Sequence, residues 1–181
     1  ITAVVLAFLR GGKVSILPWF WIPEAQAKDR EDRDGVPYRA WAKEGFVAMT
    51  PGATIDYNYV RRKLHELKTR YDVAAIAYDP WNANYFKDEL GRDGFEMVEV
   101  KQSLSMLNGP TKELERLILS AEFEHDGNPV LRWMVSNAVT TSDTNGNIKL
   151  DKKKSTARID GLAATVNAIA VLLSGIAATS K

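Results

Sequence analysis

Two aspartates in this chain stand where a carboxylate is delivered to the edge of a β-sheet. Asp79 follows the apolar run 74–78, and Pro80 then turns the backbone out of the strand. This geometry places Asp79 at the carboxyl edge of a parallel sheet, where ligands of α/β folds bind. Asp160 opens a long helix of small residues near the C-terminus. Two carboxylates brought together at such an edge would suit Mg²⁺-dependent cleavage of phosphodiesters.

Each aspartate also has a purely structural explanation. An Asp before a Pro makes a good helix N-cap followed by a good first helical residue, which is worth roughly 1 kcal/mol. Asp160 would be stabilised in a first helical turn by the helix dipole. For Asp79 the two roles are compatible, because a carboxylate that leaves a central strand lies at the sheet edge whether or not it caps a helix. Small residues on the helical face of Asp160 predict close packing of that helix on the sheet.

A cluster of positive charges lies just before Asp160. It consists of Lys152, Lys153, Lys154 and Arg158. Such a run fits either a solvated surface or a patch that contacts phosphates. If the two carboxylates hold metal, these side chains would suit the phosphate backbone of DNA.

The other residues capable of chemistry favour structural roles. His65 lies in the basic pattern of a helix, and His125 has no second ligand at a zinc-like spacing. Asp56 precedes a helical pattern and is expected to cap it. The sequence has no P-loop, no Gly-x-Gly-x-x-Gly and no Gly-x-Ser-x-Gly motif, which argues against ATP, dinucleotide and α/β-hydrolase sites.

Composition is typical of a single globular domain. The chain has 181 residues, of which 45% are hydrophobic and 26% charged, and its net charge is +1. Contacts with nucleic acid must therefore come from local basic patches. There is no cysteine, which excludes disulfides and thiolate sites. The apolar run 162–178 contains polar and small residues, so it predicts a buried helix rather than a membrane span, and the first residues lack a signal-peptide pattern.

Periodicity predicts a mixed α/β fold with helices on the faces of a mixed sheet. A hairpin is predicted for 1–9 and 14–22, closed by Gly11 and Gly12. The other predicted strands are 73–78 and 95–100, and a small hairpin joins 139–141 to 148–150. The predicted helices are 57–71, 81–90, a segment around 114–121 and a last helix from about 156. Segment 24–34 is expected to be an exposed helix or flap, 49–56 a loop, and 130–138 has no clear pattern.

A succession of short motifs runs through the whole chain. These are 17–23, 55–57, 77–82, 108–112, 128–133, 145–147 and 158–161. In this order they resemble the nuclease domain of the large terminase subunit of tailed bacteriophages, or of a prophage copy. Each motif is short, and their succession carries the resemblance.

The resemblance implies a single RNase H-like nuclease domain over 1–181 that cuts concatemeric viral DNA during genome packaging. It implies a site for two Mg²⁺ or Mn²⁺ ions, built from three acidic residues that include Asp79 and Asp160. The remaining family acid lies on a first strand just before the point where this chain begins, and residues 1–10 contain no acid. That strand and the ATPase motor domain are therefore expected to be missing, and the chain alone is expected to be weakly active or inactive.

The resemblance also implies partners and a location. The expected partners are double-stranded DNA, the small terminase subunit and the portal or procapsid, with no membrane, in the host bacterial cytoplasm. Two alternatives stay open: another RNase H-like nuclease of the junction-resolvase or integrase type, and a non-catalytic module that binds DNA or docks on a protein. The second alternative would use Trp19, Trp21 and Trp41 as an interface, although core packing is the simpler role for them.

Overall fold

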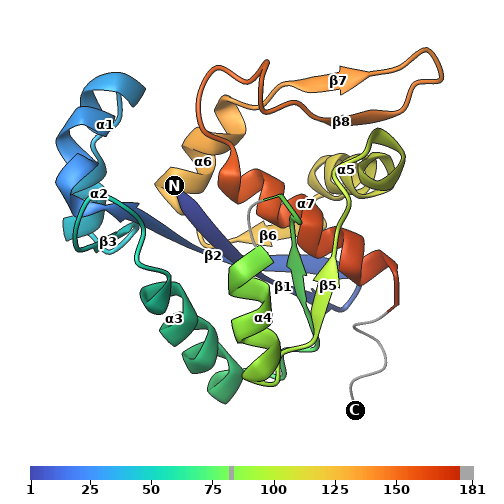
Figure 1. The fold of residues 1–181 in the computed structure, drawn as a ribbon. Coiled ribbons are helices and arrows are strands. Elements are labelled where there is room, and N and C mark those ends of the chain that lie inside the picture. Colours follow the sequence, from blue (N-terminus) through green and yellow to red (C-terminus); the bar gives the residue numbers. More distant parts are fainter. Residues whose placement is uncertain (82–83, 176–181) are drawn as a thin grey trace.

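A long antiparallel hairpin crosses the middle of the computed structural model, which describes residues 1–81 and 84–175 (Figure 1). Strand β1 (Thr2–Arg10) pairs along its whole length with β2 (Lys13–Pro23). Gly11 and Gly12, with φ of 58° and 82°, form the turn, a conformation that glycine adopts at little cost. The predicted hairpin is confirmed.

Strand β2 also carries two short parallel partners on its other edge. It pairs with β6 (Phe123–His125) near its start and with β3 (Ala48–Thr50) at its end, which makes the sheet mixed. Neither short strand was predicted, and β3 overlaps the segment expected to be a loop. A strand of three residues is too short to show an alternating pattern.

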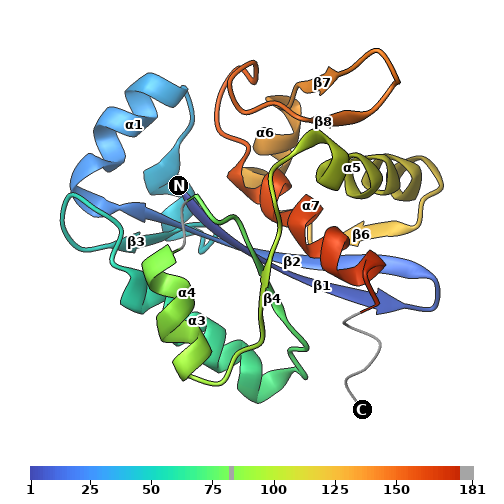
Figure 2. The same cartoon turned by 45° about the vertical axis from the view of Figure 1, so that its right-hand side comes forward.

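A second strand pair lies beside the hairpin. Strands β4 (Ile76–Tyr78) and β5 (Met97–Glu99) are parallel, within the predicted strands 73–78 and 95–100. Across the described part of the chain, no backbone pairing joins β4 to β1. Helix α7 (Asp160–Leu173) packs against both β1 and β4 and connects the two strand sets (Figures 1 and 2).

The remaining elements surround these strands. They are a 3₁₀ turn (Glu24–Gln26), α1 (Ala27–Asp34), α2 (Tyr38–Lys43), α3 (Tyr57–Arg70), α4 (Asn84–Arg92), α5 (Leu104–Leu119), α6 (Pro129–Ser136), β7 (Thr140–Ser142) and β8 (Ile148–Leu150). Helix α3 and the β7–β8 hairpin confirm their predictions, and α1 lies in the predicted exposed helix. No helix in the described ranges is long and apolar enough to cross a membrane.

Several helix boundaries differ from the prediction. Helix α5 starts after Ser103, whose Oγ accepts a hydrogen bond from the Met106 amide (3.2 Å), and it continues through Pro110. Helix α6 occupies the segment without a clear pattern, and Asn128 caps it through its side chain. Helix α7 begins at Asp160 rather than near Thr156. Side-chain caps therefore mark the starts of α5 and α6 where the apolar pattern did not, whereas Ile159 before α7 makes no such bond.

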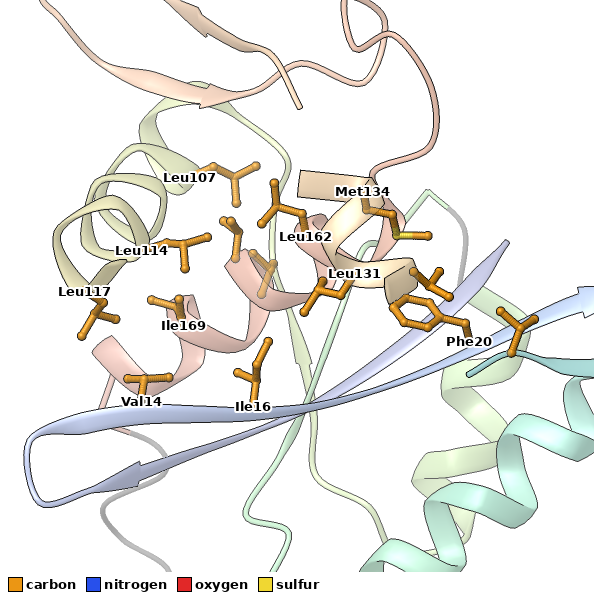
Figure 3. Close-up of a cluster of buried hydrophobic side chains, with 14 of the residues drawn as sticks. Val14, Ile16, Phe20, Leu107, Leu114, Leu117, Leu131, Met134, Leu162 and Ile169 are labelled. Carbon is orange, nitrogen blue, oxygen red and sulfur yellow. The ribbon is translucent and has the colours of Figure 1, made fainter. Parts of the chain in front are cut away.

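The hydrophobic core lies on both faces of the hairpin. On one face, Val14, Ile16 and Phe20 of β2 point toward α5, α6 and α7 (Figure 3). The side chains that meet them include Leu107, Leu114, Leu117, Leu131, Met134, Leu162 and Ile169. On the other face, Trp21 packs in a second cluster with residues of α3 and α4. Trp19 and Trp41 also pack against these clusters, so these three tryptophans contribute to the core.

Candidate functional site

Asp160 is held at the first position of α7 by very close packing of the helix on β2. A Cβ added to the next residue, Gly161, would lie 2.7 Å from Cε1 of Phe20. The Gly161 amide donates a hydrogen bond to Sδ of Met134 at 3.0 Å. The expectation that small residues bring this helix close to the sheet is confirmed, and the contact fixes the position of Asp160.

The Asp160 carboxylate has an acceptor that the protein does not use. Its Oδ2 atom is buried and has no hydrogen-bond partner among the described residues. A buried charged oxygen without a donor is costly, so such atoms call for an explanation. A bound cation would satisfy this oxygen, because hard divalent cations prefer carboxylate ligands.

Asp79 follows β4 directly and is mostly buried, with 18% of its side chain exposed. Its Oδ1 accepts a hydrogen bond from the Trp81 amide at 3.0 Å, and its Oδ2 lies 4.0 Å from Nζ of Lys152. Trp81 is in a turn, and the described helix α4 begins at Asn84. The carboxylate therefore stabilises this turn, whereas the predicted helix start at residue 81 is wrong.

The ends of β4 and α7 meet near the start of β1. Both views place the carboxyl end of β4 and the first turn of α7 beside the first residue (Figures 1 and 2). The backbone nitrogen of Ile1 lies within electrostatic reach of Asp160. Within 1–81 and 84–175, no three His, Cys, Asp or Glu side chains form a group that could hold a metal. Asp79 and Asp160 alone are therefore too few side chains to form such a group in the described ranges.

The four side chains of the predicted basic cluster have different neighbours. Lys152 faces Asp79, as described above. Lys154 is held by Asp151, at 3.8 Å from its Oδ2, and donates to Oγ1 of Thr141 at 3.3 Å. All four side chains are exposed, and Lys153 and Arg158 have no side-chain ion pair among the described residues. The cluster therefore presents exposed positive charge next to Asp79 and Asp160.

The other sequence candidates make local contacts. Asp56 caps α3 by accepting from the Asn58 amide at 2.9 Å, as predicted. Nε2 of His65 lies 2.9 Å from Oδ2 of Asp93. Nδ1 of His125 accepts from the Gly127 amide at 3.0 Å. These contacts fit structural roles.

Sequence reasoning missed a further positive side chain near the site, that of Arg30. Arg30 of α1 lies, with Asp160 and Arg158, within electrostatic reach of the Ile1 nitrogen. The segment 24–34 looked like a solvated helix because it is rich in charge, and no spacing linked it to residues 158–160. Only the folded path from α1 to the start of β1 brings them together.

A family model matches nearly the whole chain. The model of the terminase large subunit endonuclease domain matches residues 1–175. The chain belongs to this family. The expected terminase resemblance is confirmed, and the match favours a terminase nuclease domain over the junction-resolvase and integrase alternatives.

Relatives and a solved structure agree with this assignment. The chain is 35% identical over 167 residues to the terminase large subunit of Enterobacteria phage HK97, covering 91% of this chain and 33% of that protein. It is 29% identical over 161 residues to protein YmfN of Escherichia coli K12, covering 86% of this chain and 35% of that protein.

The crystal structure of the HK97 bacteriophage large terminase superimposes with a TM-score of 0.84 at 31% identity. The match covers 94% of this chain and 36% of that chain. The terminase nuclease fold is RNase H-like, as expected from the sequence. The chain spans about a third of the length of the relatives that it matches.

Proposed function

We propose that this terminase domain is a metal-dependent endonuclease that cuts concatemeric viral DNA during genome packaging. The observation that carries the proposal is the buried, unpartnered Oδ2 of Asp160, because the helix that Asp160 begins packs against β4, the strand that Asp79 follows. The expected partners are double-stranded DNA, the small terminase subunit and the portal or procapsid, in the host cytoplasm.

Asp79 and Asp160 would hold two Mg²⁺ or Mn²⁺ ions together with a further acid. Bound metal would supply an activated water and stabilise the leaving 3′ oxygen. Lys152 lies beside Asp79 and would balance its charge before metal binds. Lys153, Lys154 and Arg158 would bind backbone phosphates, and the β7–β8 hairpin would guide the duplex.

We infer that the third acid comes from a strand upstream of Ile1 in a longer protein. Strands β1 and β4 each have one partner strand in the described ranges, so each has an unpaired edge. Both are continuous apolar runs, a pattern typical of central strands, yet no residue of either strand is fully buried. Both pack against α7. An added strand between them would join the two strand sets and deliver an acid beside Asp160.

A plasmid-nicking assay with Mn²⁺, Mg²⁺ or EDTA tests this function. It should compare the chain with a version extended upstream by roughly one strand of ~5–6 residues and a turn. We expect metal-dependent nicking by the extended version, with loss of nicking after Asp79→Ala or Asp160→Ala. Asp72→Ala, at an exposed position after α3, is the matched control.

Two results would contradict the proposal. Full nicking by a protein that carries both Asp79→Ala and Asp160→Ala would remove these carboxylates from the mechanism. No nicking by either version, together with no rise in melting temperature on adding Mn²⁺, would favour a non-catalytic module that binds DNA or docks on a protein.

A further inference from the structure

Arg30 presents a buried guanidinium nitrogen that no group in the described structure accepts. Its Nε and Nη2 atoms donate to Oε1 of Gln26, at 3.2 and 2.8 Å, within helix α1. Its Nη1 atom is buried and has no hydrogen-bond partner in the described ranges. An unmatched buried donor on a charged group is costly, which points to an acceptor that binds there.

The guanidinium of Arg158 lies within electrostatic reach of Arg30. Burial, and then the positive charge of Arg158, lower the pKa of Arg30, so the two cations are close enough to repel each other. Asp34, whose negative charge acts on Arg30, is already engaged by Arg33 (2.7 Å) and by the Tyr38 hydroxyl (2.8 Å). Two close, incompletely neutralised guanidinium groups attract an anion with several oxygen atoms.

The position of Arg30 is fixed by the anchoring of α1 to the core. Tyr38 is fully buried, and its ring makes edge contacts with Trp41 and Trp133 at centroid distances of 5.7 and 6.0 Å. Through its hydroxyl, Tyr38 holds Asp34, which lies one helical turn after Arg30. The guanidinium is therefore presented by a rigid element rather than by a free surface helix.

We propose that Arg30, together with Arg158, binds a backbone phosphate of the DNA next to Asp160 and thereby positions the strand for cutting. This inference rests on the proposed nuclease function, because it assigns the phosphate to DNA. Arg30 acts on the substrate, whereas the metal would be held by carboxylates. Changing Arg30 should therefore affect DNA without affecting metal binding.

The first test measures the affinity of the chain for a fluorescent 20-base-pair duplex in EDTA at several salt concentrations. We expect Arg30→Gln to weaken binding roughly tenfold and to reduce the slope of log K against log salt by about 1. Lys28→Gln, which removes an exposed charge from the same helix, is the control and should change both values less. If Arg30 had a purely structural role, Arg30→Gln would not reduce the slope of log K against log salt more than Lys28→Gln does.

The second test uses nicking by the extended version. Arg30→Lys keeps the charge but loses the planar pair of donors, so it should keep most of the DNA affinity while slowing cutting. The melting-temperature rise caused by Mn²⁺ should be the same in the unmodified protein and in Arg30→Gln. If Mn²⁺ stabilisation and nicking persist at full rate in Arg30→Gln, the inference is wrong although the nuclease function stands.

A free phosphate ion has the same kind of oxygen atoms as a DNA phosphate and is the alternative ligand for Arg30 and Arg158. If inorganic phosphate raises the melting temperature of the unmodified chain but not of Arg30→Gln, and duplex affinity is equal in both, the site binds free phosphate. That outcome would overturn the assignment to DNA. If Asp160→Ala leaves both Mn²⁺ stabilisation and nicking intact, the proposed function itself fails.

Discussion

Gly161 shows how one missing side chain sets the position of a candidate metal ligand. Replacing it with Ala would drive a Cβ to within 2.7 Å of the Phe20 ring and 3.1 Å of Met134 Sδ. We expect Gly161→Ala to lower the free energy of unfolding by about 1–3 kcal/mol, through overpacking. Urea denaturation measures the change.

Gly91 of α4 provides the matched control for that substitution. A Cβ at Gly91 would meet nothing within 4 Å. Gly91→Ala should therefore stabilise the chain by about 0.5–1 kcal/mol, the usual gain from replacing a helical glycine. Equal effects of the two substitutions would show that packing at Gly161 is not tight.

Asp93 should make the contact between α3 and the end of α4 sensitive to low pH. Hydrogen bonds from Arg61 and then from His65 hold the pKa of Asp93 well below its usual range. Because the pKa of Asp93 is lower in the folded than in the unfolded chain, its ionised carboxylate stabilises the fold at pH values above the unfolded pKa of about 4. This stabilisation is lost progressively as the pH falls below that value and the carboxylate becomes protonated. Asp93→Asn should therefore be less stable than the unmodified chain at pH 7.

The difference between the two proteins should shrink as the pH falls from 5 toward 2. Chemical denaturation at a series of pH values measures it. Asp88→Asn, at an exposed position of α4, is the control and should show no such pH-dependent difference. A constant gap between Asp93→Asn and the unmodified chain over this range would contradict the prediction.

At the scale of elements, helix α1 contacts the core through the buried Ala27, and the Tyr38 hydroxyl ties its C-terminal end to α2. Burial, and then the hydrogen bond to Asp34, raise the pKa of Tyr38, so the hydroxyl stays protonated and donates. Tyr38→Phe keeps the packing with Trp41 and Trp133 but removes this bond. We expect a loss of about 1 kcal/mol in the free energy of unfolding.

Hydrogen exchange shows where that loss occurs. In Tyr38→Phe the amides of α1 should exchange faster, while those of α7 keep their protection. Tyr59→Phe, at a half-buried position of α3, is the control and should leave the exchange of α1 unchanged. Uniformly faster exchange across the molecule would mean that Tyr38 serves general stability instead.

Long patterned elements could be predicted from the sequence, and short ones could not. The hairpin, α3 and the β7–β8 turn have apolar repeats or strong turn residues, and they fold as predicted. β3 and β6 have three residues each and depend on pairing with β2. Helix α5 continues through Pro110, which the apolar pattern placed outside it. Tertiary pairing and capping decided these elements.

The candidate site was only partly predictable for the same reason. Asp79 follows a strand-end pattern and Asp160 a helix-start pattern, so both could be identified as candidates from the sequence. Arg30 belongs to a helix that looked solvated, and its relation to Arg158 depends on where α1 lies in the fold. Contacts between segments far apart along the chain leave no local pattern.

At the scale of the whole molecule, the small net charge of +1 makes DNA binding a local property. Lys153 and Lys154 are both exposed, but Lys154 also contacts Asp151 and Thr141. Lys153→Gln should weaken duplex binding about equally for all sequences and reduce the salt slope by about 1. Lys154→Gln should have a smaller effect. Equal losses would show that the contacts of Lys154 with Asp151 and Thr141 do not weaken its contact with phosphate.

The unpaired edge of β1 has a consequence for how the isolated chain behaves at high concentration. This strand has nine residues, is largely apolar and has one partner strand in the described structure. Exposed apolar edges of this length promote strand pairing between molecules. The isolated chain should therefore self-associate, which sedimentation at increasing concentration would reveal. An upstream strand would then protect the protein against aggregation as well as complete its site.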